Sequence, residues 1–189
     1  MCIRDRFIAV LVLIFSLQSW TKADDIRDFE IEGMSIGDSL LDYFSEEEIN
    51  NFEKVQYKSN RYTDVEIEKK FTTYEILHIG FLTQDPEKLI AGIDGIIYYK
   101  SNIMDCHNKI KEIYEEVLSI VNDLNDLGLE SNPMKGTEGI FTDYVLESKN
   151  EDEIQIGCYD YYTDEFDDQL RLGIRTIDLR KFISYEAYK

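Results

Sequence analysis

Few side chains in this sequence have the types and spacing that catalysis needs. The chain has only two histidines, His78 and His107, so histidine-based acid–base or metal chemistry has few candidates. His107 directly follows Cys106, and neighbouring side chains on a helix point about 100° apart, which argues against a nucleophile–base pair. His78 falls in an alternating segment and is interpreted as a partly exposed sheet residue. The sequence contains no phosphate-binding loop, nucleophile elbow or zinc motif, so we predict no catalytic residue.

Cys106 and Cys158 are predicted to form a disulfide. They are the only cysteines after residue 23, and an even number suits an oxidising compartment. Cys106 falls on the apolar stripe of a predicted helix and Cys158 on the apolar face of a predicted strand, so packing of the helix on the strand brings the thiols together. Closing a loop of about 50 residues would stabilise the fold by roughly 4 kcal/mol. The alternative is two buried free thiols, since cysteine also packs as a small apolar residue.

An acidic loop, residues 160–168, holds five carboxylates and is the only cluster with the oxygen ligands that calcium prefers. Asp160, Asp164 and Asp168 are its weak candidate ligands. The loop lacks the alternate spacing and central glycine of an EF-hand, so we interpret it as a solvated hairpin turn and predict neither a metal nor another cofactor. A carboxylate pair for glycoside hydrolysis stays open, because its separation of about 5–10 Å depends on the fold.

Tyrosine is the other residue type in excess, with 13 in the chain. Several lie at the ends of predicted strands beside acidic residues, and an exposed tyrosine offers a large contact area with a polar tip. The candidates for a protein-binding surface are Tyr98, Tyr99, Tyr159, Tyr161 and Tyr162. Ordinary cross-strand packing is the alternative explanation.

The charge balance limits the classes of partner. The 189 residues include 39 acidic and 20 basic side chains, which gives a net charge of −19. This charge repels phosphate backbones and anionic lipid headgroups, so we expect neither nucleic-acid binding nor membrane-surface binding. The chain is 43% apolar and can bury a core, which excludes wholesale disorder.

Residues 1–23 have the parts of a secretory signal peptide. Arg4 and Arg6 precede nine uninterrupted apolar residues, a run too short to span a bilayer core of about 30 Å. Thr21 and Ala23 suit positions −3 and −1 of a cleavage site. We expect cleavage after Ala23 and a periplasmic or secreted bacterial protein, and an uncleaved membrane anchor is the alternative.

No second long apolar stretch follows, so no membrane span is expected after cleavage. Residues 1–6 look like a spurious leader of a translated sequence assembly, which leaves the true start open. Residues 24–189 are expected to form a single domain.

Two short helices are expected near the beginning of this domain, one starting at Ser35 or Ser39 and one capped by Ser45 and Glu48. The later richness in Tyr, Thr and Ile favours strands. Strands are predicted at about 54–62, 69–82, 88–99, 139–147, 153–159 and 168–177, and a short helix at 178–186. In the last strand, alternation places Leu170, Leu172 and Ile174 on one face and turns Arg171 and Arg175 away.

One long helix is predicted at residues 102–125, because apolar residues recur there at spacings of three and four. Segment 123–139, with its glycines and a proline, is interpreted as the connector that ends this helix. The predicted fold class is α+β. It has antiparallel three-stranded meanders in two similar halves, 31–100 and 102–186, and the long helix packs on the sheet because its apolar stripe must be buried.

Residues 31–44, IEGMSIGDSLLDYF, resemble the opening of small periplasmic modules built of two helices and a three-stranded meander. These include a lipoprotein of the outer-membrane barrel-assembly machinery and the β-lactamase-inhibitor-like proteins. The chain after residue 23 also looks like a set of uncharacterised secreted proteins of small-genome marine bacteria. That resemblance implies the compartment and no activity. The chain lacks the lipoprotein's cysteine after the apolar run, which puts a membrane tether and an assembly role in doubt.

Two functions from different classes follow. The first is a secreted, non-catalytic binding protein that holds an envelope protein or another extracytoplasmic partner through a tyrosine-rich acidic sheet face. The second is a periplasmic carboxylate-based hydrolase whose acids converge only in three dimensions. Two carboxyl groups facing each other in a deep pocket would favour the hydrolase, and a flat or convex face would favour the binding protein.

Overall fold

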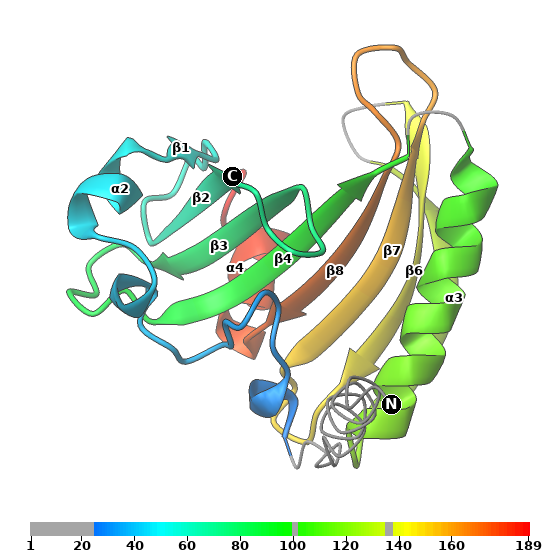
Figure 1. Cartoon of the computed structure of the whole chain (residues 1–189), viewed down its shortest axis with the longest axis horizontal. Helices are drawn as coiled ribbons and strands as arrows, with labels where there is room; N and C mark the ends of the chain where they lie inside the picture. Colours follow the sequence, from blue (N-terminus) through cyan, green and yellow to red (C-terminus); the bar gives the residue numbers. More distant parts are fainter. Residues whose placement is uncertain (1–24, 100–101, 135–137) are drawn as a thin grey trace, which may run out of the picture.

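One antiparallel sheet of eight strands organises the molecule (Figure 1). The computed structural model describes residues 25–99, 102–134 and 138–189, so the expected signal peptide lies outside the described residues. The strands are β1 (Glu53–Lys54), β2 (Tyr62–Glu68), β3 (Ile76–Leu82), β4 (Ile90–Tyr98), β5 (Asn125–Pro133), β6 (Gly139–Glu147), β7 (Glu153–Tyr161) and β8 (Gln169–Arg175). Their order across the sheet is β1-β2-β3-β4-β8-β7-β6-β5, so the chain builds two meanders that join at their last strands.

Helices complete the α+β fold. They are η1 (Ile26–Asp28), η2 (Leu40–Asp42), α2 (Glu46–Asn51), α3 (Ile103–Ile120) and α4 (Ile177–Tyr185). The side chain of Ser45 accepts a hydrogen bond from the backbone N–H of Glu48, and the Glu48 side chain accepts one from the Ser45 N–H. This is the predicted capping box, in which each side chain satisfies a backbone donor that the helix leaves free.

The predicted meanders of three strands are incomplete, because each meander has a fourth strand. Segment 123–139 is not only a connector: β5 lies within it and pairs with β6 from Ile140 to Glu147. A bulge at Gly128, whose φ of +88° glycine adopts without strain, lets this glycine-containing segment continue as a strand. The long helix accordingly ends at Ile120 rather than at residue 125, since Val121 is already extended.

Two further strand boundaries differ from the prediction. The expected strand 54–62 is replaced by the short β1 and by β2, which begins at Tyr62. The expected strand 69–82 begins only at Ile76. The backbone N–H groups of Thr72, Thr73 and Tyr74 all donate to the carboxylate of Glu32, at 2.9, 2.5 and 3.1 Å, so this stretch turns around a side chain instead of pairing with a strand.

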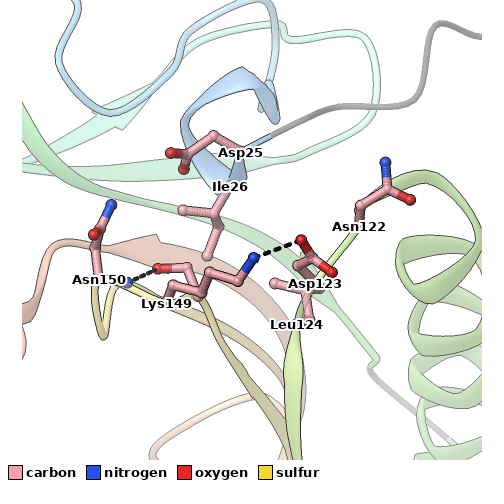
Figure 2. A pocket seen from close by; sticks show the side chains of 8 residues that line it. Asp25, Ile26, Asn122, Asp123, Leu124, Lys149 and Asn150 are labelled. Atoms are coloured by element: carbon pink, nitrogen blue, oxygen red, sulfur yellow. Dashed lines mark hydrogen bonds and ion pairs between the residues drawn. The ribbon is translucent and has the colours of Figure 1, made fainter.

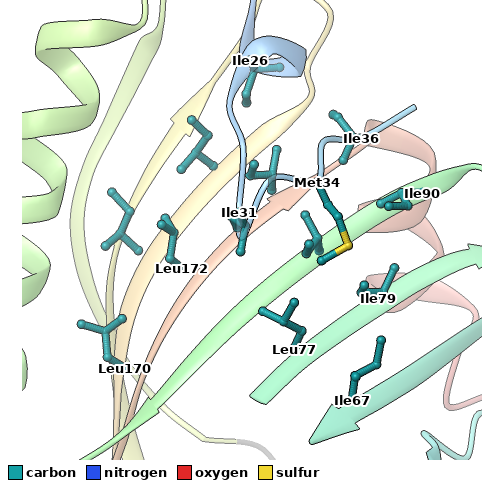
Figure 3. Packing of buried hydrophobic residues seen from close by; sticks show 14 of the residues in the cluster. Ile26, Ile31, Met34, Ile36, Ile67, Leu77, Ile79, Ile90, Leu170 and Leu172 are labelled. Atoms are coloured by element: carbon teal, nitrogen blue, oxygen red, sulfur yellow. The ribbon is translucent and has the colours of Figure 1, made fainter. Parts of the chain in front are cut away.

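One face of the sheet carries the main core and is here called the core face. Figure 3 shows Ile26, Ile31 and Met34, from the part of the chain that precedes η2, on the same side of the sheet as Leu77 and Leu172. All five belong to one buried cluster. Helix α3 covers the same face beside β6, β7 and β8 (Figure 1). The apolar stripe predicted from the spacing therefore packs as expected, because it removes apolar surface from water.

The opposite face is here called the polar face, and α4 covers one end of it. Leu179 of α4 lies directly over Gly92 of β4, where a Cβ atom would come within 2.5 Å of its Cδ2. Phe182 and Ala187 are fully buried there beside Tyr62. Glycine on the strand thus allows the helix to approach the sheet closely.

A disulfide joins Cys106 of α3 to Cys158 of β7, with 6.1 Å between their Cα atoms. Both residues are fully buried, so the predicted link between helix and sheet lies inside the core. No helix of the described segments has the length and apolar character needed to cross a bilayer.

Candidate functional site

The polar face is unusual because its centre is occupied by charged side chains. Strand alternation places Glu66, His78, Asp94, Arg171 and Arg175 on this face, while their neighbours in sequence fill the core. Charges that are removed from water must be paired or hydrogen-bonded to be tolerated, so their partners indicate which are structural and which are available to a ligand.

Arg175 is the most heavily paired of these residues. Its Nη2 lies 2.8 Å from both carboxylate oxygens of Asp94, and its Nη1 lies 2.6 Å from Oε1 of Gln155 and 3.5 Å from a carboxylate oxygen of Glu153. Burial by itself lowers the pKa of Arg175, but the charge of Asp94 and its hydrogen bond outweigh that effect and leave the pKa raised. Arg175 is therefore held as a cation and joins β4, β7 and β8.

A second set of partners lies toward β2 and β3. Nε2 of His78 is 3.0 Å from a carboxylate oxygen of Glu66, and the hydroxyl of Tyr57 donates to Asp64 at 3.0 Å. Burial raises the pKa of Asp64, and the charge of Asp94 raises it further. The other oxygen of Asp64 is buried and has no hydrogen-bond partner in the described chain, so its carboxyl group is disfavoured in the ionised form.

α4 covers one end of the polar face, and aromatic side chains from neighbouring strands form a row at the other end. Tyr98 of β4 pairs with Gln169 of β8, which pairs with Tyr159 of β7, which pairs with Phe141 of β6. The rings of Tyr159 and Phe141 have centroids 4.2 Å apart. Gly157 leaves room for this contact, because a Cβ atom there would collide with the Phe141 ring.

A hollow of about 390 Å³ opens beside this row and is here called the aromatic hollow. Its lining residues are Glu66, His78, Ile96, Tyr98, Tyr161, Glu165, Phe166, Asp167, Gln169 and Arg171. The Phe166 ring packs 5.2 Å from that of Tyr161, yet 53% of the surface of Phe166 is exposed. The aromatic hollow thus combines a few aromatic side chains with a mainly polar lining that carries both signs of charge.

The five tyrosines predicted to form a binding surface do not all lie on the same part of the structure. Tyr98 and Tyr161 line the aromatic hollow, and Tyr159 lies beside it, half-buried beneath the side chain of Arg171. Tyr99 packs against the core face instead, because consecutive residues of a strand point to opposite sides. Tyr162 is exposed on the turn after β7. The candidate surface is therefore narrower than the sequence suggested.

The acidic loop forms the turn between β7 and β8. Asp168 accepts a hydrogen bond from the backbone N–H of Tyr161 at 2.8 Å, which fixes the turn. Asp160 lies in β7, and burial followed by the charge of Asp168 raises its pKa, while His107 of α3 lowers it. Over residues 25–99, 102–134 and 138–189, no group of three metal-ligating side chains converges, so Asp160, Asp164 and Asp168 form no such cluster.

The structure also bears on two other kinds of catalytic group, a cysteine nucleophile and a carboxylic acid. Cys106 is oxidised in the disulfide and has no thiol to act as a nucleophile beside His107. Asp143 of β6 has its pKa raised by burial, although a hydrogen bond from Gln155 at 2.7 Å lowers it. A carboxyl group with a raised pKa is a general requirement for acid catalysis, so Asp64 and Asp143 are the residues to consider for a hydrolase.

Hollows elsewhere have less to offer a ligand. Figure 2 shows one of about 170 Å³ near Ile26, where Lys149 and Asp123 form an ion pair at 2.6 Å across the opening. Another, of about 410 Å³, lies on the core face between Phe29, Tyr74 and α3 and has mainly apolar walls. In the first hollow Lys149 and Asp123 pair with each other, and in the second Lys109 is already paired with Glu112.

Sequence reasoning missed Arg171, Gln169 and Phe166 as site residues. The alternation of β8 did place Arg171 away from the core, as the structure confirms. Nothing local indicated that β8 would lie between β4 and β7, which is what brings Arg171 beside Tyr98 and Tyr159.

The chain matches no protein-family model, no curated protein and no solved structure. The resemblances noted from residues 31–44 and from the whole chain therefore stay predictions.

Proposed function

We propose that this is an extracytoplasmic, non-catalytic binding protein that holds an envelope protein or another envelope component at the aromatic end of its polar face. The observation that carries the proposal is the exposure of Phe166, a large apolar ring, directly beside Tyr161 and in the same hollow as Tyr98. Aromatic residues that remain exposed beside a hollow are typical of binding surfaces.

The expected compartment and the charged pairs of the polar face support this proposal. The buried Cys106–Cys158 disulfide suits an oxidising environment, and the apolar run before residue 23 suits export. The charged pairs across β4, β7 and β8 make a rigid platform for the aromatic residues, because Arg175 binds side chains from both neighbouring strands. A rigid platform lowers the entropy that is lost when a partner binds. A duplication that produced the two similar halves expected from the sequence, 31–100 and 102–186, would account for the two meanders.

Affinity capture from envelope extract of the source cells tests this function. Three baits are compared: the wild-type protein, Phe166→Ser in the aromatic hollow, and Tyr185→Ser, which removes a somewhat more exposed ring from α4. We expect one enriched partner with the wild type and with Tyr185→Ser, and its loss with Phe166→Ser. Failure of the wild type to enrich any protein or glycan component in mild salt would contradict the proposal.

A carboxylate-based hydrolase is the second candidate, favoured by the raised pKa of Asp64 and of Asp143. It ranks second because both carboxyl groups already have protein partners, Tyr57 and Gln155. A panel of glycoside and ester substrates would separate the two functions. Turnover by the wild type that is abolished in Asp143→Asn, with unchanged thermal stability, would favour the hydrolase.

A further inference from the structure

Arg171 differs from the other arginines that the structure describes. Arg27, Arg61, Arg175 and Arg180 each form an ion pair with a carboxylate. Arg171 forms none with the described residues, and its Nε is buried without a hydrogen-bond partner there. In a chain with 39 acidic side chains, an arginine on a sheet without any carboxylate partner calls for an explanation, since buried polar groups are normally satisfied.

The surroundings of Arg171 hold its side chain in place. Its guanidinium carbon lies 4.7 Å from the centre of the Tyr159 ring, a stacked arrangement that arginine favours. Gly157 of β7 pairs with Arg171 and has no side chain, and the Phe141 ring occupies the space above it. On the other side Ile96 of β4 is buried. Arg171 is therefore positioned by packing and lines the aromatic hollow without an ion pair to any described carboxylate.

We infer that the aromatic hollow binds an organic carboxylate, with the carboxylate at Arg171 and an apolar body against Tyr98, Tyr161 and Phe166. This inference rests on the proposed function, because it assigns the chemistry that the same surface recognises. The planar guanidinium matches a carboxylate, and its hydrogen bonds strengthen where water is displaced. The three aromatic rings supply contact area for the rest of the ligand.

The acidic residues of the hollow restrict the ligand further. Glu66 is bound to His78, but Glu165 and Asp167 are exposed on the turn between β7 and β8 and line the same hollow. Their negative charge opposes any anion, and it opposes a dianion about twice as strongly as a monoanion. A monoanionic carboxylate should therefore bind in preference to inorganic phosphate, which is largely dianionic at pH 7.5.

The test compares two probes of nearly equal shape, indole-3-acetate and its neutral amide, indole-3-acetamide. Binding is measured by calorimetry and by chemical-shift changes of the isotope-labelled protein at pH 7.5, with phosphate as a third probe. The variants are Arg171→Gln and Arg171→Lys, with Arg61→Gln as the matched control, because Arg61 forms an exposed ion pair with Glu186. Circular dichroism confirms that each variant is folded.

For the wild type and for Arg61→Gln we expect indole-3-acetate to bind at least about tenfold more tightly than the amide. Arg171→Gln should abolish that preference, and Arg171→Lys should retain only part of it. Equal binding of both probes to the wild type, no binding of either, a preference that persists in Arg171→Gln, or tighter binding of phosphate would each overturn the inference.

Failure of the carboxylate inference can be distinguished from failure of the proposed binding function. If Phe166→Ser loses the captured partner while Arg171→Gln keeps it and the probes show no preference, the carboxylate inference fails and the binding function stands. If the wild type captures nothing but the probes behave as expected, the protein binds a small carboxylate and the macromolecular partner is wrong.

Discussion

Asp94 of β4 and Arg175 of β8 meet across the sheet because Gly173 lies between them. Gly173 is the direct pairing partner of Asp94, and a Cβ atom at that position would collide with the Asp94 carboxylate. Nη2 of Arg175 can therefore reach both oxygens of Asp94 at 2.8 Å. Both side chains are mostly buried, with 14% and 13% of their surface exposed, so this pair joins the two meanders inside the fold.

Breaking this pair should destabilise the protein strongly. We expect Arg175→Met to lower the free energy of unfolding by about 3–5 kcal/mol, because it leaves Asp94 buried without its cation. The double variant Asp94→Leu/Arg175→Met should lose less than the sum of the single variants. Urea denaturation measures all three. Arg61→Met is the control, since its exposed pair with Glu186 should contribute less than about 1 kcal/mol. Strict additivity of the two changes would contradict the coupling.

Removing the disulfide should destabilise the protein through its unfolded state. The variant Cys106→Ser/Cys158→Ser opens a link between residues that are 52 positions apart in sequence, and we expect a loss of about 2–5 kcal/mol. A reductant should lower the melting temperature of the wild type and leave that of the variant unchanged. Titration of the denatured wild type without reductant checks the bond directly, and two reactive thiols after residue 23 would show that the disulfide is absent.

Stability should respond to pH through Asp64. Burial raises the pKa of this carboxyl group in the folded protein, so the folded state binds the proton more tightly than the unfolded state. Stability therefore falls as pH rises from the ordinary aspartate pKa, about 3.9, to the folded value. Asp64→Asn should melt at a higher temperature than the wild type at pH 7, and the difference should vanish near pH 3.5.

Melting curves between pH 3.5 and 8 test this prediction, with Asp164→Asn as the control because Asp164 is exposed on a turn. A variant that is less stable than the wild type at pH 7 would mean that the ionised Asp64 is stabilised by its contacts with Tyr57 and His78 rather than strained by burial.

The docking of α4 should depend on Gly92. A Cβ atom there would lie 2.5 Å from Cδ2 of Leu179 and 3.3 Å from the backbone oxygen of Ile174, so Gly92→Ala should cost about 1–3 kcal/mol by overpacking. Leu179→Ala removes the obstructing methyl groups, and the double variant should lose less than the sum of the two single changes. Gly80→Ala is a milder comparison, because its Cβ would lie 3.0 Å from the same Leu179 atom. Equal losses at the two glycines would contradict this geometry.

Local patterns in the sequence were sufficient for several elements. Helix α3 follows from apolar residues at helical spacing, and α2 begins at Ser45, the side chain predicted to cap a free backbone N–H group. The strand predicted at about 139–147 is β6, and alternation placed Arg171 and Arg175 on the face opposite Leu170 and Leu172. Cys106 and Cys158 lay on apolar faces that had to pack together, so their pairing could be predicted. These features depend on interactions within a few residues or on burial of one face.

Other features depend on partners that are distant in sequence. Strand β5 contains Gly128 and Pro133 and has weak strand propensity, and it is a strand because β6 supplies its hydrogen bonds. The start of β3 is set by Glu32, whose carboxylate binds the backbone N–H groups of residues 72–74. Such contacts leave no periodic signal in the sequence.

Only the tertiary structure decided which of the candidate side chains lie together in one site. Residue types and alternation identified Tyr98, Tyr159 and Tyr161 as candidates and turned Arg171 out of the core, but they could not show that β4, β8 and β7 would be neighbours in that order. Pairing of β4 with β8 places Tyr98 level with Gln169, and pairing of β8 with β7 places Gln169 level with Tyr159. Strand order and register between distant segments are fixed by the burial of the whole core face, so only the folded chain determines which side chains share a hollow.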